Sequence, residues 1–443
     1  MSRAALLVWC VALLGPVGWV AQEPLGLPGR YFLGQFGEGW FAELYVFPDG
    51  DSLRAIVLTR VTHAALVFEQ EPRREGFHAM VHLSMEFIDT LGIVRRRLDL
   101  RDTVWARYYE TTLARDSSWS RGVEVRIPMS VSRCRLQLFS SQREARQQEL
   151  PIRVIQGVPQ WTTPLLVQAE ADTAYVPFVL GAALPFGRSQ VRCLLWDSRL
   201  KAGATYTYSC RQMPPEAGER WWDSTPELRG NAYAERGGRL ELHPQLVPQP
   251  GFRFRPDPLP VGAWVEVYLP TAALVPGRYE MALVKADTAS PDTLRYSFRV
   301  VWTAMPVSLR RISYALQSMY YILPDKEWER FRGGSAQEQW ERVWRYWKQR
   351  DPTPATAYNE AMAAYFRRVD HAYFAFQSAT EPDGMRTERG KIYILYGEPT
   401  RVEREFPSGR ASREVWVYER FRQRFLFELR PDGRWRLASV EQL

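Results

Sequence analysis

The residues best suited to acid–base chemistry lie in the last quarter of the chain: Asp351, Glu388, Arg389 and Tyr396. Carboxylates of this kind can transfer protons when burial raises their pKa, provided that the segments carrying them converge on one crevice. The alternative is structural, because an arginine at position 350 or 389 that pairs with one of the carboxylates would tether two loops by charge-assisted hydrogen bonds. We favour the structural interpretation and assign no catalytic residue.

The sequence lacks the short motifs that mark most hydrolases, nucleotide-binding proteins and metalloenzymes. It contains no G-x-S-x-G, no P-loop, no H-E-x-x-H and no Cys-x-x-Cys. His78 and His82 share one face of a predicted strand at a spacing that could hold a metal. They have no nearby third ligand, so we interpret them as solvent-exposed. We therefore predict no cofactor and no metal site.

The segment that would position the polar residues is a predicted strand over Lys391 to Tyr396. Its apolar side chains fall on both faces, which is typical of a strand buried on both sides. Gly397-Glu-Pro399 ends it with a proline that cannot donate to a ladder. Gly384 is expected to supply an unusual backbone angle where the chain turns into this strand.

The elements around this strand are predicted to be helices and short strands. Apolar residues recur every three or four positions in three segments, which predicts amphipathic helices at 309–323, 335–350 and 359–377. The second opens with a capping box, Ser335-Ala-Gln-Glu338. Alternating segments at 413–419, 424–429 and 434–439 predict an antiparallel meander. Residues 304–443 are thus expected to form an α+β domain, a three-helix region plus a β meander.

The motif in this domain resembles the signature of the GWxTD-domain family, a group of bacterial envelope proteins of undetermined function. The matching residues are Gly384-Met-Arg-Thr-Glu388 followed by Arg389-Gly-Lys-Ile-Tyr-Ile-Leu-Tyr-Gly-Glu-Pro399, and Trp347 to Glu360 resembles the family's helical lead-in. Met385 stands where the family has tryptophan, and Glu388 where it has aspartate. The resemblance implies a structural corner or a partner contact made by the motif residues: Arg350, Asp351, Pro352, Gly384, Met385, Thr387, Glu388, Arg389, Gly390, Tyr393, Tyr396, Gly397 and Pro399.

Residues 27–302 have the short alternating segments and turn signals of all-β proteins. We predict two all-β immunoglobulin-like sandwiches, at 27–157 and 158–302, because a pattern of strand, proline, loop and strand near Pro128 recurs near Pro270. The second contains an insertion at 214–260 that is rich in Pro, Gly, Arg and Trp and includes Trp221-Trp222. It is expected to be a loop that either binds a partner or packs on its own domain.

Two of the cysteines could form a disulfide. Cys193 and Cys210 are placed symmetrically about the turn Lys201-Ala-Gly-Ala204, so a hairpin there would let them pair across its ladder. The alternative is two separate buried thiols. Cys134 is expected to be a core thiol, because it lies on the apolar face of a predicted strand.

The N-terminus predicts export. Met1 to Ala21 has a single early arginine followed by an apolar run, which is typical of a signal peptide at 1–21 and implies a periplasmic or extracellular protein. The run is too short for a membrane-spanning helix, and no transmembrane segment is expected in the mature chain. The formal net charge of +8 comes mainly from arginine, since only five of the 58 basic residues are lysine. The arginines are scattered among acidic residues, so we expect no nucleic-acid partner. They reflect either codon bias or a thermophilic source, or else an anion-binding face.

Together these features favour a non-catalytic interaction or structural module of the cell envelope, with an envelope protein as its partner. Two alternatives stay open. The chain could bind anionic glycans or lipid head groups through arginine and tryptophan. It could also be a carboxylate-dependent hydrolase that acts on an envelope polymer.

Overall fold

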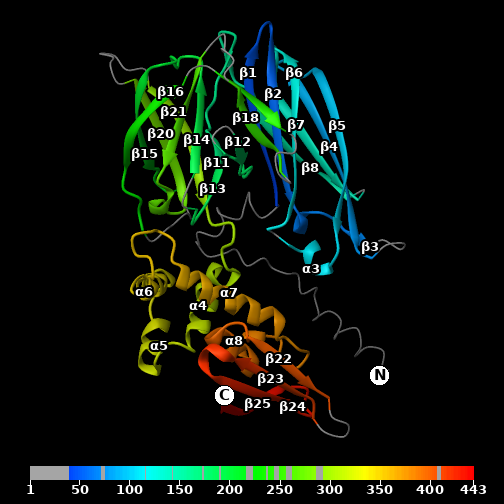
Figure 1. The fold of residues 1–443 in the computed structure, drawn as a ribbon, viewed down its shortest axis with the longest axis vertical. Coiled ribbons are helices and arrows are strands. Elements are labelled where there is room, and N and C mark those ends of the chain that lie inside the picture. Colours follow the sequence, from blue (N-terminus) through cyan, green and yellow to red (C-terminus); the bar gives the residue numbers. More distant parts are fainter. Residues whose placement is uncertain are drawn as a thin grey trace, which may run out of the picture.

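The computed structural model describes residues 39–70, 75–114, 116–141, 143–171, 174–188, 191–215, 223–235, 238–243, 249–255, 262–285, 293–406 and 411–443. The predicted signal peptide at 1–21 and the Trp221-Trp222 pair lie outside these residues. The described chain is mostly β, and its longer helices lie in the C-terminal part. Figure 1 shows the β-rich part above and a domain of helices and one small sheet below.

The first β unit consists of two sheets that pack on a common core. One is three-stranded, in the order β1 (Trp40–Asp49), β2 (Ser52–Thr62), β6 (Ser118–Pro128). The other is built around β4, which pairs with both β5 and β7: β3 (Glu69–Gln70), β4 (Phe77–Asp89), β5 (Val94–Ala106), β7 (Val131–Ser140) and β8 (Arg143–Pro151). Short elements complete the unit: η1 (His63–Ala65), α3 (Tyr109–Thr112), β9 (Val154–Ile155) and β10 (Val158–Pro159). Alternate residues of both sheets fill the core, as the period of two predicts for β4.

The second β unit contains eleven strands: β11 (Leu165–Ala171), β12 (Ala174–Pro177), β13 (Ala183–Pro185), β14 (Val191–Asp197), β15 (Thr205–Gln212), β16 (Leu228–Glu235), β17 (Arg239–His243), β18 (Gly251–Arg255), β19 (Ala263–Leu269), β20 (Gly277–Lys285) and β21 (Thr293–Val301). Their hydrogen-bonded order is β13-β21-β20-β15-β16-β19-β14-β11-β12-β18-β17. The prediction of a loop at 214–260 is wrong, because β16, β17 and β18 lie within it. The alternation of β17 and β18, Arg-Leu-Glu-Leu-His and Gly-Phe-Arg-Phe-Arg, is already the strand pattern.

The two β units share the three-stranded sheet. Strands β1 and β2 are buried over nearly their whole length, because one face meets the first core and the other meets the core of the second unit. The ring of Phe47 lies 5.2 Å from that of Trp161, 5.9 Å from Trp196 and 5.7 Å from Trp264. The guanidinium of Arg54 donates across the same junction to the carbonyl of Leu240 at 2.9 Å. The two β regions are therefore joined by a common layer.

The predicted hairpin around residues 201–204 does not form. β14 pairs with β11 and β19, whereas β15 pairs with β16 and β20, so the connection crosses between strands that are not neighbours. Cys193 and Cys210 are free, buried thiols, so of the two alternatives the structure has the separate thiols and not the bond across a ladder. The symmetric placement of the two cysteines about residues 201–204 did not predict which strands pair, because strand pairing here is set by long-range packing. Cys134 is a buried core thiol, as predicted.

These three thiols should resist alkylation in the native protein. Burial raises the pKa of Cys134 and of Cys210 to about 12, and it also raises the pKa of Cys193, so little thiolate is present at neutral pH. We expect iodoacetamide to label all three positions in unreduced, denatured protein and none of them before denaturation. Peptide mapping by mass spectrometry checks this, and a Cys193–Cys210 peptide in the unreduced sample would contradict it.

The C-terminal domain follows the predicted α+β plan with two additional helices. Its helical elements are η3 (Val307–Arg310), α4 (Ile312–Met319), α5 (Asp325–Arg332), α6 (Ala336–Lys348), α7 (Glu360–Ala375), η4 (Gly384–Arg386) and α8 (Glu388–Tyr396). The meander is β22 (Arg401–Glu405), β23 (Arg413–Tyr418), β24 (Gln423–Leu429) and β25 (Trp435–Gln442), paired in chain order. The capping box at Ser335 and Glu338 is confirmed. Among the described residues, no helix combines the length and the apolarity needed to cross a membrane.

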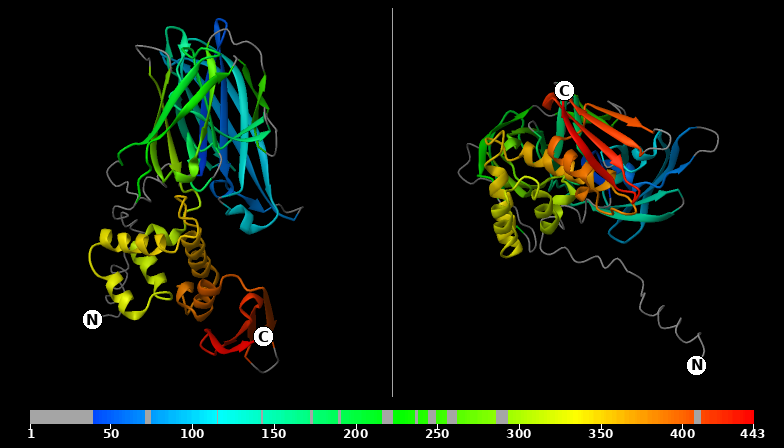
Figure 2. Two further views of the ribbon diagram at one scale, coloured as in Figure 1. Left: turned by 60° about the vertical axis from the view of Figure 1, so that its left-hand side comes forward. Right: turned by 90° about the horizontal axis from the view of Figure 1, so that it is seen from below.

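Helix α7 connects the two halves of the molecule. The left view of Figure 2 shows it running from the base of the β-rich part toward the C-terminal sheet. Its inner face, with Met362, Phe366 and Val369, belongs to the same continuous core as the second β unit. The two segments of the motif lie at the two ends of this helix, before Glu360 and after Ala375.

Candidate functional site

The lead-in segment fixes the start of α7. The side chain of Asn359 accepts a hydrogen bond from Met362 N at 2.8 Å and donates to the Trp347 carbonyl at 2.7 Å, so one buried amide caps α7 and holds the end of α6. Asp351 accepts from Thr353 N at 2.9 Å in the turn that contains Pro352. These contacts lock the link between the two helices.

The same segment docks the helices on the second β unit. Tyr358, Phe186 and Trp302 contact one another edge-to-face. The ring of Tyr358 lies 5.3 Å from that of Phe186 and 5.7 Å from that of Trp302. Ala357 N donates to the carbonyl of Ala272 at 2.7 Å. The lead-in of the motif is therefore an interface between two parts of the chain.

The predicted strand over Lys391 to Tyr396 is wrong, because this segment lies in α8. Thr387 caps the helix: its hydroxyl accepts from Gly390 N at 2.9 Å and donates to the Gly384 carbonyl at 2.8 Å. Gly397 ends it with a φ of 85°. The helix lies between α7 and the meander, so Ile394 enters the helical core while Ile392 packs on the sheet. A helix covered on both sides gives the same apolar run as a buried strand.

Two glycines allow the turn between α7 and α8. A Cβ on Gly384 would lie 2.3 Å from the carbonyl oxygen of Ala372, and a Cβ on Gly390 would lie 2.0 Å from that of Gly384. Gly384 is not in the left-handed region, so the expectation of an unusual backbone angle there is wrong. The glycine is needed because two backbones meet, which is the other physical reason for this residue type.

The charged residues of the motif do not pair as expected. Arg389 contacts Glu414 at 3.0 Å, and both side chains are largely buried. The ring of Trp435 lies 4.8 Å from the guanidinium. Desolvation lowers the pKa of Arg389, and Glu414 opposes this effect. Glu388 instead accepts from Leu437 N and lies 3.5 Å from Arg436, so the two adjacent motif residues hold two different strands of the meander.

The crevice that would join Asp351 to Glu388 does not exist. The two carboxylates lie beyond opposite ends of α7, whose 16 residues span about 24 Å. Arg350 stacks on Tyr346, 3.6 Å from the ring centroid, and makes no pair with either carboxylate. The predicted ion pairs of residues 350 and 389 with Asp351 and Glu388 are wrong.

The remaining motif residues fill the space around α8. Met385 is buried in the helical core, and its carbonyl accepts from the Tyr321 hydroxyl at 3.0 Å. Tyr393 stacks on His371 with ring centroids 4.3 Å apart. Tyr396 contacts Tyr418, Phe421 and Phe425 on the meander. Pro399 is half-buried in the link from Gly397 to β22.

Glu414 is the important residue that the sequence analysis missed. It lies on the same side of β23 as Trp416 and Tyr418, the side that faces α8. A carboxylate in an apolar row of period two requires a buried partner. The position of Glu414 among the apolar residues of β23 was therefore a sequence signal that it pairs with a buried cation.

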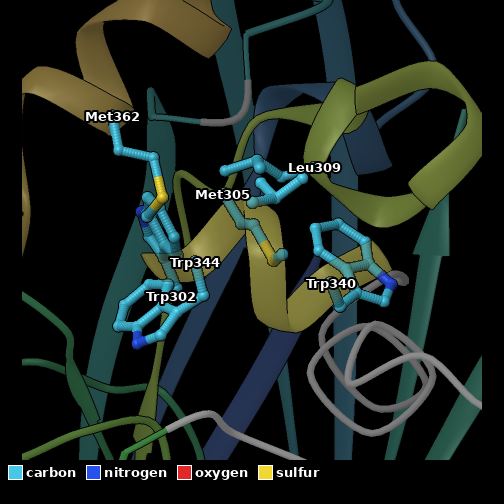
Figure 3. Close-up of a pocket in the computed structure, with 7 residues that line it drawn as sticks. Trp302, Met305, Leu309, Trp340, Trp344 and Met362 are labelled. Atoms are coloured by element: carbon cyan, nitrogen blue, oxygen red, sulfur yellow. The ribbon is translucent and has the colours of Figure 1, made fainter. Parts of the chain in front are cut away.

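The tryptophan face of α6 packs in the core and leaves one small cavity. Figure 3 shows its lining, in which Trp340 and Trp344 of α6 meet Trp302, Met305, Leu309 and Met362. The cavity measures about 10 Å³, about the room that one water molecule needs. It is apolar and too small to be a ligand site in this conformation.

The described residues contain no group of three or more His, Cys, Asp or Glu arranged to hold a metal ion. His82 lies 2.9 Å from Asp99 and stacks on Phe139, and His78 lies beside Trp105. Both histidines are half-buried rather than solvent-exposed, and their neighbours on the sheet explain their positions.

We expect Arg389→Ala to destabilise the protein more than Glu388→Ala. The Arg389 pair is largely buried, so removing the cation should cost about 2–4 kcal/mol, while Arg404, 3.5 Å from Glu414, supplies a weaker substitute. Glu388 is more than one third exposed, so its removal should cost about 1 kcal/mol. Urea unfolding of the two variants measures the difference. Equal losses, or a larger loss for Glu388→Ala, would contradict this assignment.

Comparison with known families confirms the resemblance. Residues 281–433 match the model of the GWxTD domain, so the matched region begins in β20 and ends before β25. No curated protein matches the chain. The C-terminal part of the chain is thus similar to the GWxTD domain, and the matched residues include one strand pair of the second β unit.

Proposed function

We propose that this chain, whose C-terminal part is similar to the GWxTD domain, is a non-catalytic interaction or structural module of the bacterial cell envelope. In this proposal the signal peptide at 1–21 is removed on export, and the mature protein acts in the periplasm or outside the cell. The joined β units form a rigid support that presents the C-terminal domain to an envelope protein.

The observation that carries this proposal is the internal use of the motif. Thr387 caps a helix, Asn359 caps another, and Arg389 is paired with Glu414 beneath the meander. A catalytic carboxylate would be directed into a cleft, whereas Glu388 accepts a backbone N–H of β25. Motif residues that make these internal contacts stabilise the fold of the C-terminal domain. A stably folded domain can present a fixed surface to a partner protein.

The residues that would contact a partner are exposed aromatic side chains of the C-terminal domain. Phe374 at the end of α7 is 64% exposed, and Phe406 after β22 is 74% exposed. Large exposed aromatic side chains are enriched where proteins bind other proteins. We propose that these two residues contact the partner.

One observation favours the ligand-binding alternative. A shallow groove of mixed polar and apolar lining lies on the second β unit; its lining includes Thr207, Ser209, Asn231, Arg229, Glu227, Tyr208, Ala282 and Val284. Its arginine is already paired with Glu227 at 2.7 Å, which weakens the case for an anionic glycan or lipid head group. The hydrolase alternative has no such support, because Asp351 and Glu388 lie apart.

We also propose an immunoglobulin-like plan for the two β units. The support is the packing of two antiparallel sheets over one core in the first unit, and an antiparallel arrangement of all but one strand pair in the second.

Site-specific photocrosslinking in the native envelope tests the proposed function. A photoreactive amino acid at position 406 or 374 should yield one adduct of defined mass. The same amino acid at Leu91, an apolar residue 79% exposed in the first β unit, is the matched control and should yield none. Equal labelling at all three positions, or no adduct at 406 and 374, would overturn the proposal. Identifying the first residue of the mature protein in the same sample tests whether residues 1–21 are removed on export.

A further inference from the structure

A carboxylate without a cation lies at the junction of the two β units. Glu43, on β1, is buried, and its register partner on β2 is Leu58. One carboxylate oxygen accepts from the backbone N–H groups of Leu180 and Ala182, each at 3.0 Å, and the other accepts from the Tyr45 hydroxyl at 2.8 Å. Within the described part of the chain, no lysine, arginine or histidine forms an ion pair with Glu43.

The loop that Glu43 holds has a strained backbone. Val179 has a φ of 48° and Ala182 a φ of 56°, both in the left-handed region that side chains with a Cβ avoid. The loop connects β12 to β13, and Leu180 packs with Phe41 and Val301. Hydrogen bonds to the carboxylate therefore keep an unfavourable conformation in place between the two units.

The hydrogen bonds at Glu43 can be made by a neutral acid as well as by a carboxylate. When the oxygen that faces Tyr45 carries a proton, it can donate to the tyrosine oxygen. The tyrosine hydroxyl then turns to the carbonyl of Pro164, which lies 3.4 Å away. The other oxygen continues to accept both backbone N–H groups. The neutral form keeps every contact and avoids burying an unpaired charge, which is costly.

We propose that Glu43 is a proton-binding latch between the two β units, and that its protonation tightens the docking of loop 178–182. The other groups that face it fit this role. Tyr45 is buried, the buried thiol of Cys193 on β14 lies near Tyr45, and Arg60 on β2 donates to the Phe178 carbonyl at 3.3 Å rather than to Glu43. The loop itself carries no ionisable side chain.

Burial raises the pKa of Glu43 above its ordinary value of 4.5, although the hydrogen bonds from Ala182, Tyr45 and Leu180 oppose the shift. When the folded pKa is the higher one, the docked loop binds a proton that the released loop does not. Docking is then strongest below pH 4.5 and weakens as the pH rises through the folded pKa. Within that window the docking equilibrium constant falls by up to about tenfold per pH unit.

Hydrogen exchange of the full-length protein tests the latch. In the wild type, protection of the Leu180 and Ala182 amides, corrected for intrinsic exchange, should fall as the pH rises. In Glu43→Gln the amide keeps the neutral hydrogen-bond pattern, so protection should be independent of pH. Glu69→Gln, at an exposed position of β3, is the matched control and should behave as the wild type.

Infrared spectroscopy gives an independent readout. A protonated carboxylic acid band should persist above pH 4.5 in the wild type and be missing in Glu43→Gln. The proposal is overturned if Glu43→Gln keeps the pH dependence of the wild type, if the wild type shows none, or if the band is absent.

Discussion

Gly390→Ala should be among the most destabilising single substitutions in this protein. The added Cβ would lie 2.0 Å from the carbonyl oxygen of Gly384 and 3.0 Å from that of Met385. Both contacts are with backbone carbonyls, which the hydroxyls of Thr387 (at Gly384) and Tyr321 (at Met385) hold in place, so no side chain can move aside. Overpacking usually costs about 1–3 kcal/mol of folding stability. Because the clash at Gly390 cannot be relieved, we expect the free energy of unfolding to fall by at least about 3 kcal/mol. Urea unfolding monitored by tryptophan fluorescence measures it.

Gly333→Ala is the control. Gly333 ends α5, its backbone is not in the left-handed region, and the nearest atom to an added Cβ is 3.8 Å away. We expect a change within about 0.5 kcal/mol, as for other surface substitutions. If Gly390→Ala were as stable as Gly333→Ala, the close packing of α8 against η4 would be wrong.

Phe47→Ala should have the second largest effect. Phe47 is 1% exposed and contacts three tryptophans of the second β unit from a strand of the first. Truncation of a buried phenylalanine costs about 3–5 kcal/mol, because transfer energy is lost and a cavity is left. The cavity would open inside the shared layer, so both β units should lose stability together.

Differential scanning calorimetry separates this result from a local one. The wild-type β units should unfold in one transition, and Phe47→Ala should shift that whole transition downward. Phe374→Ala, at an exposed position, should leave it nearly unchanged. A Phe47→Ala profile in which only the first unit melts early would show that the two units are independent.

The helices were predictable where local chemistry defines them. Ser335 and Asn359 cap α6 and α7. Apolar residues recur along these helices every three or four positions, because only one face of each helix is buried. The same reasoning failed at α8, where both faces are covered and the periodic signal disappears. Thr387 three residues before Gly390 was the remaining helix signal, since threonine is a preferred N-cap.

Strand pairing was less predictable than strand existence. Cys193 and Cys210 lie on strands that do not pair with each other, because β19 and β20, more than 50 residues later, take the neighbouring positions. The partner of Arg389 was also set by long-range packing. Glu414 is 25 positions away in the sequence and comes near Arg389 only when the meander folds. The sequence pattern located the strands and singled out Arg389, while long-range packing selected the partners of both.

The central claim is that the GWxTD motif is a structural joint, and the most direct test is crosslinking yield in folded motif variants. The photoreactive group at position 406 is combined with Thr387→Ala, Arg389→Ala or Glu388→Ala, and labelling is done below the melting temperature of each variant. We predict the wild-type yield of the partner adduct in every variant that is folded at that temperature. Loss of the adduct in a variant that circular dichroism shows to be folded would contradict the claim and make that motif residue a functional contact.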